Sequence, residues 1–272
     1  MPSLTIMKIS HDKAREWDAS AYHRVSAPQV SWGRKVLERL PLRGDETVLD
    51  AGCGTGRLTK ELLELLPQGR VVGLDVSENM LRTAREHLEP EFGGRVEFLA
   101  CDLLDLPFDR KFDGIFSTAA FHWVHDHDRL FQKLFQALKP GGWLCAQCGG
   151  GPNIKRLLDR VAVLASRPEY GPYIGGYDPW FYDNPDTAAE RLRSVGFDEV
   201  ETDLHDAPTQ FSTGPEFREF VAKVILRQHL DRIPHEKLRN DLMDELTKQA
   251  SEDSPPFLLD YWRLNLKGRR PE

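Results

Sequence analysis

The chain of 272 residues has few cysteines, no long apolar run and no excess of basic residues. Its four cysteines are too few for a disulfide framework in a chain of this length. A membrane-spanning helix needs roughly 20 consecutive apolar residues, and no run approaches that length, so we expect no membrane partner. Residues 1–8 show no basic segment followed by an apolar one, which predicts a cytoplasmic protein without a secretory signal.

The charge balance is acidic, with 43 Asp and Glu residues against 36 Lys and Arg residues and a net charge of −7. Binding to a phosphate backbone requires clustered cations, so this balance argues against a nucleic-acid partner. The apolar fraction of 40% is ordinary for a globular protein. Composition does not determine the oligomeric state.

Short β-rich runs alternate with helical stretches between residues 45 and 150. The expected strands are 47–49, 70–74, 96–100, 112–117 and 143–147, and the expected helices are 58–66, 77–88 and 128–138. Strands that alternate with helices of this length form a parallel sheet covered on both faces, with right-handed crossovers. The sequence therefore predicts an α/β fold with a doubly wound, mostly parallel sheet.

The segments before and after residues 45–150 do not show this regular alternation of strands and helices. Residues 1–44, with helices expected at 17–22 and 29–40, are interpreted as an N-terminal helical cap on a core of residues 45–150. Residues 151–272 are interpreted as the rest of the sheet with helical and loop lid insertions over a substrate. The expected helices there are 153–165, 187–194, 216–230 and 234–249, and the expected strands are 200–204 and 257–267. A long loop is expected over 170–182, and such loops typically act as lids.

Two patterns suggest metal chemistry, but neither has the right geometry. Cys145 and Cys148 have CxxC spacing on an expected strand, where residues three apart point to opposite faces. In the histidine-rich run 122–128, Asp126 or Asp128 is a natural N-cap for the helix that follows. We therefore expect no metal site.

The decisive segment is a strand that runs into a glycine-rich turn and then a helix, Val48-Leu49-Asp50-Ala51-Gly52-Cys53-Gly54-Thr55-Gly56. Glycine permits positive φ and a close approach of backbone to a ligand, and the helix N-terminus offers N–H groups. Asp75 ends the next strand, where a carboxylate can accept both ribose hydroxyls. A nicotinamide-binding turn has the spacing G-x-G-x-x-G, but Arg57 occupies the third glycine position.

This turn resembles the first motif of the class I S-adenosylmethionine (SAM)-dependent methyltransferases. Later motifs of that family are matched by 73–81, Cys101-Asp102-Leu103, 112–117 and Leu138-Lys139-Pro140-Gly141-Gly142. The resemblance covers about residues 45–150. It implies a Rossmann-like methyltransferase fold with a seven-stranded sheet, SAM as the cofactor and an enzyme that transfers a methyl group.

The resemblance also implies individual roles. Asp50, Gly52 and Gly54 would line the methionine end of SAM, Asp75 would hold the ribose, and Asp102 would bond the adenine amino group. The other expected cofactor contacts are Val76 and Met80 against the adenine, with Leu103, Ser117 and Tyr22.

The segments around this core are similar to small-molecule carboxylate methyltransferases of the trans-aconitate and juvenile-hormone-acid type. The matching residues are Trp17, Tyr22, Ser26-Ala27-Pro28-Gln29 and Phe121-His122-Trp123-Val124. This similarity implies a small-molecule acceptor that is methylated on a carboxylate oxygen. A carboxylate is already ionised at pH 7, so the protein needs mainly to orient it. Gln29, His122 and Trp123 are donors of the right type, and we expect them to be the catalytic residues.

Other interpretations remain open from the sequence alone. Trp123 could be a core aromatic, His122 a structural histidine and Gln29 a solvent-facing helix residue. The methylated atom could be nitrogen or carbon, or the protein could bind SAM without transferring its methyl group. Methylation of nucleic-acid amines is disfavoured because residues 117–121 lack the Asn/Asp-Pro-Pro-aromatic box.

Overall fold

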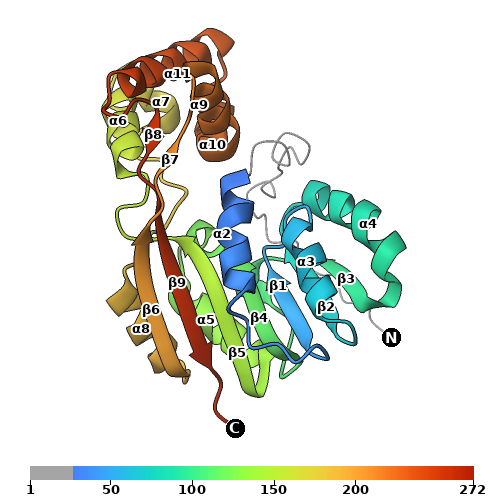
Figure 1. The fold of residues 1–272 in the computed structure, drawn as a ribbon. Coiled ribbons are helices and arrows are strands. Elements are labelled where there is room, and N and C mark those ends of the chain that lie inside the picture. Colours follow the sequence, from blue (N-terminus) through green and yellow to red (C-terminus); the bar gives the residue numbers. More distant parts are fainter. Residues whose placement is uncertain (1–26) are drawn as a thin grey trace, which may run out of the picture.

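The computed structural model describes residues 27–272 and contains one seven-stranded sheet of order β3-β2-β1-β4-β5-β9-β6 (Figure 1). The strands are β1 (Thr47–Ala51), β2 (Arg70–Asp75), β3 (Val96–Ala100), β4 (Phe112–Thr118), β5 (Leu138–Gly149), β6 (Asp198–Asp206) and β9 (Trp262–Arg269). The first five pair in parallel, and β9 runs antiparallel between β5 and β6. The predicted doubly wound, mostly parallel sheet of seven strands is confirmed.

Helices cover both faces of the sheet, as near-continuous apolar strands require. One face packs against α2 (Ala27–Leu37), α3 (Arg57–Leu65) and α4 (Glu78–Phe92), and the other against α5 (His127–Ala137) and α8 (Pro185–Ser194) (Figure 1). Cys145 belongs to the first core and Cys148 to the second. The prediction that these two thiols point to opposite faces is therefore correct, and both are free.

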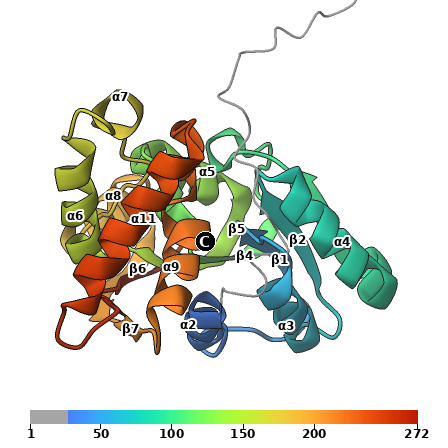
Figure 2. The same ribbon diagram turned by 90° about the horizontal axis from the view of Figure 1, so that it is seen from above.

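A separate group of helices stands beyond the carboxyl ends of the strands, on the β5–β9–β6 side of the sheet (Figures 1 and 2). It comprises α6 (Lys155–Ala165), α7 (Gly171–Ile174), α9 (Gly214–Phe220), α10 (Arg227–Arg232) and α11 (Glu236–Ser251), which share one apolar core. We call it the helical unit. The short strands β7 (Thr209–Gln210) and β8 (Leu258–Leu259) connect it to the sheet. Trp32 on α2 and Trp123 after β4 pack against its core, so the unit closes over the sheet end.

Several element boundaries differ from those expected. The helix expected over 216–230 is interrupted by a π-helical turn at Val221–Ile225. The last strand is split into β8 and β9, and the expected loop at 170–182 contains α7. Strand β5 begins at Leu138, through the Pro-Gly-Gly turn, because Gly141 adopts φ +73° and its N–H bonds to the carbonyl of Arg270 near the chain end. The residues around Gly141 do not by themselves reveal a hydrogen bond to a residue so distant in the chain.

No helix among residues 27–272 is both long and apolar enough to cross a membrane. Trp17, Tyr22 and the first expected helix lie outside the described residues.

Gly114 on β4 provides a test of how tightly the sheet is packed. A Cβ atom at Gly114 would lie 2.1 Å from the ring of Trp143 on the neighbouring strand β5. Because both residues are buried, we expect Gly114→Ala to lower the free energy of unfolding by about 1–3 kcal/mol, as overpacking does. Urea denaturation measures the change. Gly94→Ala is the control, since nothing lies within 4 Å of its Cβ, and it should change stability by less than about 0.5 kcal/mol. Equal effects of the two variants would refute the packing explanation.

Candidate functional site: the carboxyl ends of the strands

The glycine-rich turn after β1 is held by backbone bonds. The N–H groups of Gly52 and Cys53 both donate to the carbonyl of Leu74 on β2, at 2.8 and 2.9 Å. Gly52, Gly54 and Gly56 all adopt positive φ, at +89°, +54° and +79°. A Cβ at Gly56 would collide with Leu88 of α4, whereas a Cβ at Gly54 would meet nothing within 4 Å. Gly56 therefore serves packing, and the backbone at Gly54 borders open space.

Asp75, at the end of β2, fixes the far side of this turn. One carboxylate oxygen accepts the N–H of Gly54 at 3.0 Å, and the other accepts the N–H of Ser77 at 2.9 Å. Ser77 caps α4, its hydroxyl accepting the N–H of Met80. The carboxylate thus joins the glycine turn to the start of the next helix.

Asp50 is a buried acid with a perturbed pKa. Its carboxylate is 2% exposed and accepts a hydrogen bond from the Thr59 hydroxyl at 2.7 Å. Burial raises the pKa of Asp50 to about 7, opposed by the Thr59 hydrogen bond and assisted by the charge of Asp75. Together Asp50 and Asp75 give this end of the sheet a negative character.

The other predicted cofactor residues lie around the same edge. Asp102 is exposed after β3, and its Oδ1 accepts the N–H of Leu104 at 2.8 Å. Val76 is half-buried, while Met80 and Leu103 are 4% and 6% exposed. Ser117 is buried and donates to the carbonyl of Ala51, which ties β4 to β1. Their proposed contacts with a cofactor stay predictions.

The loop after β4 carries two of the expected catalytic residues and lies against the glycine turn. A Cβ at Gly52 would lie 2.4 Å from the Cβ of Ala120, so only glycine permits this approach. His122 follows two residues later and is 9% exposed. The N–H of Gly149, at the end of β5, points at His122 Nδ1 at 3.3 Å, so the neutral ring carries its proton on Nε2.

Trp123 faces a cluster of aromatic rings from the helical unit and the segment before α8. Its ring centroid is 5.8 Å from that of Trp180, and Tyr182 stacks between His122 (6.0 Å) and Trp180 (6.3 Å). His229 of α10 stacks on Trp180 at 5.3 Å, and burial lowers its pKa to about 4. Trp180 and Tyr182 of the 170–182 segment therefore lie at the same end of the sheet as His122 and Trp123.

A buried polar network holds the loop with His122 in place. The N–H of Phe181 donates to the His122 carbonyl at 2.9 Å, and buried His127 lies between the Phe121 carbonyl (3.1 Å) and Asp183 (3.5 Å). Asp126 caps α5 by accepting the N–H of Arg129 at 2.9 Å, as predicted. These residues therefore have structural contacts that account for their presence in the histidine-rich run.

Gln29 lies in the first turn of α2. Its side chain is half-buried, and its Oε1 is buried without a hydrogen-bond partner within residues 27–272. A buried amide oxygen without a partner costs about 1–3 kcal/mol, so such an atom is expected where a ligand satisfies it. The position of Gln29 is thus not that of a solvent-facing helix residue.

Sequence reasoning missed two residues of this region. Asn153 is 3% exposed, its Oδ1 accepts the N–H of Trp262, and it hydrogen-bonds Tyr182. Arg263 on β9 is 4% exposed. No local pattern could have found Arg263, because the pairing of β9 with β5 brings it here, whereas Asn153 lies in the turn just after β5.

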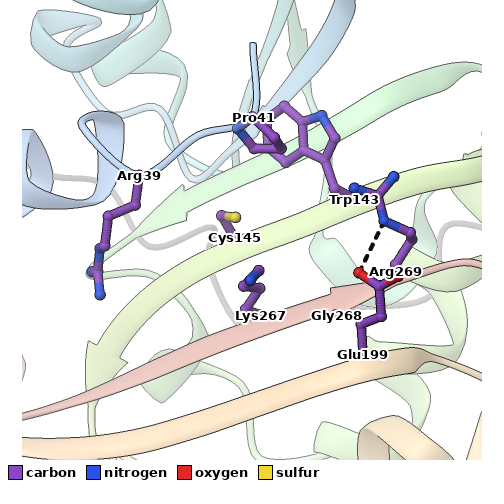
Figure 3. A pocket seen from close by; sticks show the side chains of 8 residues that line it. All are labelled: Arg39, Pro41, Trp143, Cys145, Glu199, Lys267, Gly268 and Arg269. Carbon is purple, nitrogen blue, oxygen red and sulfur yellow. Dashed lines mark hydrogen bonds and ion pairs between the residues drawn. The ribbon is translucent and has the colours of Figure 1, made fainter.

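A small hollow of about 160 Å³ lies elsewhere, between the end of α2 and strands β5 and β9 (Figure 3). It is lined by Trp143 and Cys145 of β5, far along the strand from Gly149, and its Arg269 is paired with Glu199 at 3.3 Å. It is not part of the site at the carboxyl ends.

Comparison with known proteins identifies the family. Residues 48–142 match the family described as methyltransferase domain. The trans-aconitate 2-methyltransferase of Azoarcus sp. strain BH72 is 39% identical over 157 residues, or 58% of each chain. That of Variovorax paradoxus strain S110 is 38% identical over 183 residues, or 66% of this chain and 63% of the relative. Residues 48–142 therefore belong to the methyltransferase domain family. It spans between half and two thirds of the length of these curated relatives.

Solved structures agree on the class I methyltransferase fold. Phosphoethanolamine N-methyltransferase 2 of Haemonchus contortus, in complex with S-adenosyl-L-methionine, has a TM-score of 0.62 at 21% identity over 93% of this chain and 57% of that one. The [4+2]-cyclase SpnF has a TM-score of 0.57 at 21% identity, over 89% and 81%. The fold thus also occurs in a protein named for a different reaction, so the activity must be argued from the site.

The raised pKa of Asp50 makes stability depend on pH. An acid whose folded-state pKa exceeds its unfolded value leaves the native state binding more protons, so stability falls as pH rises from about 4 to 7. The full difference for a shift of about 3 units is roughly 4 kcal/mol. In urea denaturation between pH 5 and 8, Asp50→Asn should therefore gain stability relative to the wild type as pH increases. The exposed Asp109→Asn should show no such trend, and a pH-independent difference for Asp50→Asn would contradict the assignment.

Proposed function

We propose that this methyltransferase family member transfers the methyl group of SAM to a carboxylate oxygen of a small-molecule acceptor. The observation that carries the proposal is the contact between Gly52 and the loop at Ala120. It brings the end of β1, which carries Asp50, against the loop that carries the neutral donors His122 and Trp123. The similarity to trans-aconitate 2-methyltransferases supports a carboxylate as the methylated group.

The region around Asp50 and Asp75 has the charge that a site for SAM needs. When bound, SAM supplies an electrophilic methyl group on a positively charged sulfur. Asp50 and Asp75 provide the negative potential that a cationic ligand requires, and a nearby cation favours the ionised form of Asp50. A carboxylate has about four acceptor positions, so Asp75 can hold two backbone N–H groups and still be a partner for ribose hydroxyls. The open space at Gly54 allows a ligand to approach the backbone.

The donor cluster fits a carboxylate acceptor. His122 can donate from Nε2 because Gly149 donates to Nδ1. Trp123 has an indole N–H, and the amide of Gln29 can present either its oxygen or its N–H groups by rotation. Neutral donors of this kind orient one carboxylate oxygen without protonating it, which leaves the second oxygen to face the methyl group. Orientation alone can contribute roughly 7–11 kcal/mol to the rate of such a displacement.

Binding of SAM is tested at Asp75. Isothermal titration calorimetry should give a dissociation constant at least about 100-fold weaker for Asp75→Ala than for the wild type, since hydrogen bonds to a charged group contribute about 1.5–3 kcal/mol each. Asp109→Ala, a substitution of an exposed aspartate, should bind SAM normally. Thermal melts of the free proteins establish that both variants are folded. Tight SAM binding by a folded Asp75→Ala would overturn the proposed ribose position.

Acceptor orientation is tested at Gln29. Wild-type protein incubated with labelled SAM and an acid panel that includes trans-aconitate should yield a labelled ester. We expect Gln29→Ala to lower kcat/KM about 10- to 100-fold, the loss of one or two hydrogen bonds, with SAM affinity unchanged. Gln132→Ala on the exposed face of α5 is the control. Label in an amine or a carbon product would replace the carboxylate assignment, and label in no product would favour a SAM-binding protein without transfer activity.

A further inference from the structure

His229 is a buried histidine of the helical unit whose second ring nitrogen has no role in the fold. It lies on α10 and is 2% exposed. Its Nδ1 is buried without a hydrogen-bond partner among residues 27–272, as is Oε1 of Gln29 in the proposed acceptor site. A buried polar atom without a partner is destabilising, so it is expected where a ligand completes the bond.

The ring of His229 is held close to Trp123, one of the proposed acceptor-binding residues. It stacks on Trp180 with the ring centroids 5.3 Å apart, and the centroids of Trp180 and Trp123 are 5.8 Å apart. The centroids of His229 and Trp123 are therefore separated by at most about 11 Å. Tyr177 packs edge-on against His229 at 4.9 Å. The imidazole thus belongs to the aromatic cluster at the carboxyl ends of the strands.

A π-helical turn determines which residue of α10 faces this cluster. In the turn at Val221–Ile225, which follows α9, the N–H of Leu226 donates to the carbonyl of Val221 at 2.7 Å, five residues back. Such a turn contains one residue more than an α-helical turn, so it rotates the residues that follow by about 100° around the helix axis. π turns inside α-helices occur frequently at functional sites. The position of His229 on Trp180 therefore depends on this turn.

The state of the ring determines what Nδ1 can bind. Burial lowers the pKa of His229 to about 4, so at pH 7 the ring is neutral and has one N–H and one lone pair. A hydrogen bond with the backbone of Tyr177 acts to raise this pKa, as a bond donated by the ring does. Because Nδ1 has no partner, the donating nitrogen is Nε2. Nδ1 therefore carries the lone pair and requires a donor.

The surroundings of His229 favour an uncharged donor. Asp178 and Arg232 act on its pKa in opposite directions, so neither sign of charge dominates around the ring. An ammonium group would be costly to bury among these aromatic rings without a dominant negative charge. A carboxylate has no proton to donate at pH 7. A hydroxyl is the smallest uncharged group that can donate to Nδ1.

We propose that Nδ1 of His229 accepts a hydrogen bond from a hydroxyl group of the acceptor, so that the substrate class is aromatic hydroxy acids. The aromatic frame follows from the rings of Trp123 and Trp180, because aromatic pairs gain from stacked and edge-to-face contacts. This inference rests on the proposed function, since the carboxylate of the same acceptor is the group that receives the methyl. His229 is then a specificity residue at the end of the acceptor opposite the reacting carboxylate.

Matched pairs of acids test this assignment. In 3-fluorocinnamate and 4-fluorocinnamate, fluorine replaces the hydroxyl of 3-hydroxycinnamate and 4-hydroxycinnamate with a group of similar size that cannot donate. In calorimetry with S-adenosylhomocysteine present, the wild type should bind at least one hydroxy acid about 5- to 100-fold more tightly than its fluoro counterpart, the range for one buried hydrogen bond. The kcat/KM with SAM should show the same preference. His229→Phe, which has a ring without a lone pair, should abolish the preference. His229→Asn, whose amide oxygen can accept near the position of Nδ1, should keep part of it.

His235→Phe is the matched control, because His235 is exposed just before α11 in the same helical unit. It should keep the wild-type preference, and SAM affinity should be unchanged in all variants. Nitrogen-15 magnetic resonance of the histidines in the wild type gives a readout that no variant's stability affects. Nδ1 of His229 should resonate as a nitrogen with a lone pair, and its signal should shift when the preferred hydroxy acid is added but not when the fluoro acid is added.

Three results would each overturn the inference: no preference of the wild type for either hydroxy acid, a proton on Nδ1 of His229 in the free protein, or a folded His229→Phe that keeps the preference. If the wild type esterifies the hydroxy and fluoro acids equally well, the proposed function stands and the role of His229 fails. If it binds a hydroxy acid in a His229-dependent way but transfers no methyl group to it, the proposed function fails and the binding assignment stands.

Discussion

The two hydrogen bonds accepted by Asp75 are the constraint on which the site depends. Its carboxylate takes the N–H of Gly54, in the turn after β1, and the N–H of Ser77, which precedes α4. Buried N–H groups at the ends of neighbouring strands would otherwise lack partners. With the bonds from the glycine turn to Leu74, they fix the relative position of two crossovers before any ligand is present. A preformed site of this kind loses little conformational entropy when a ligand binds.

Charge is distributed unevenly across the site, because the acidic and the basic residues lie on different strands of the sheet. Asp50 and Asp75 lie on β1 and β2, while His122 and Trp123 follow β4 and Arg263 lies on β9. In the proposed reaction the sulfonium of SAM and the carboxylate of the acceptor both become neutral. A site with negative residues on one side and hydrogen-bond donors on the other would align these two groups without a strong base. The contact of Gly52 with Ala120 joins the two halves, and a side chain at residue 52 would separate them.

Much of the core could be predicted because its signals are local. Gly52 and Gly54 have the positive φ that their place after a strand indicated, and Asp126 caps α5 as expected of an aspartate before a helix. Where the prediction was wrong, distant partners decide the backbone. β5 continues through Gly141 because that residue bonds to the carbonyl of Arg270, and the helix expected over 216–230 is broken by a π-helical turn packed within the helical unit.

The residues of β9 are the part of this region that sequence patterns predict least well. Along β9, Arg263, Asn265 and Lys267 alternate with apolar residues, which by itself is typical of a solvent-facing edge. In the folded chain Trp32 of α2 lies over Arg263, and Arg39, just after α2, donates a hydrogen bond to Asn265. Arg263 and Asn265 are 4% and 5% exposed, while the side chain of Lys267 is 48% exposed. The same helix that packs on Arg263 also carries Gln29, so the burial of the cation and the position of Gln29 both depend on how α2 packs against the sheet.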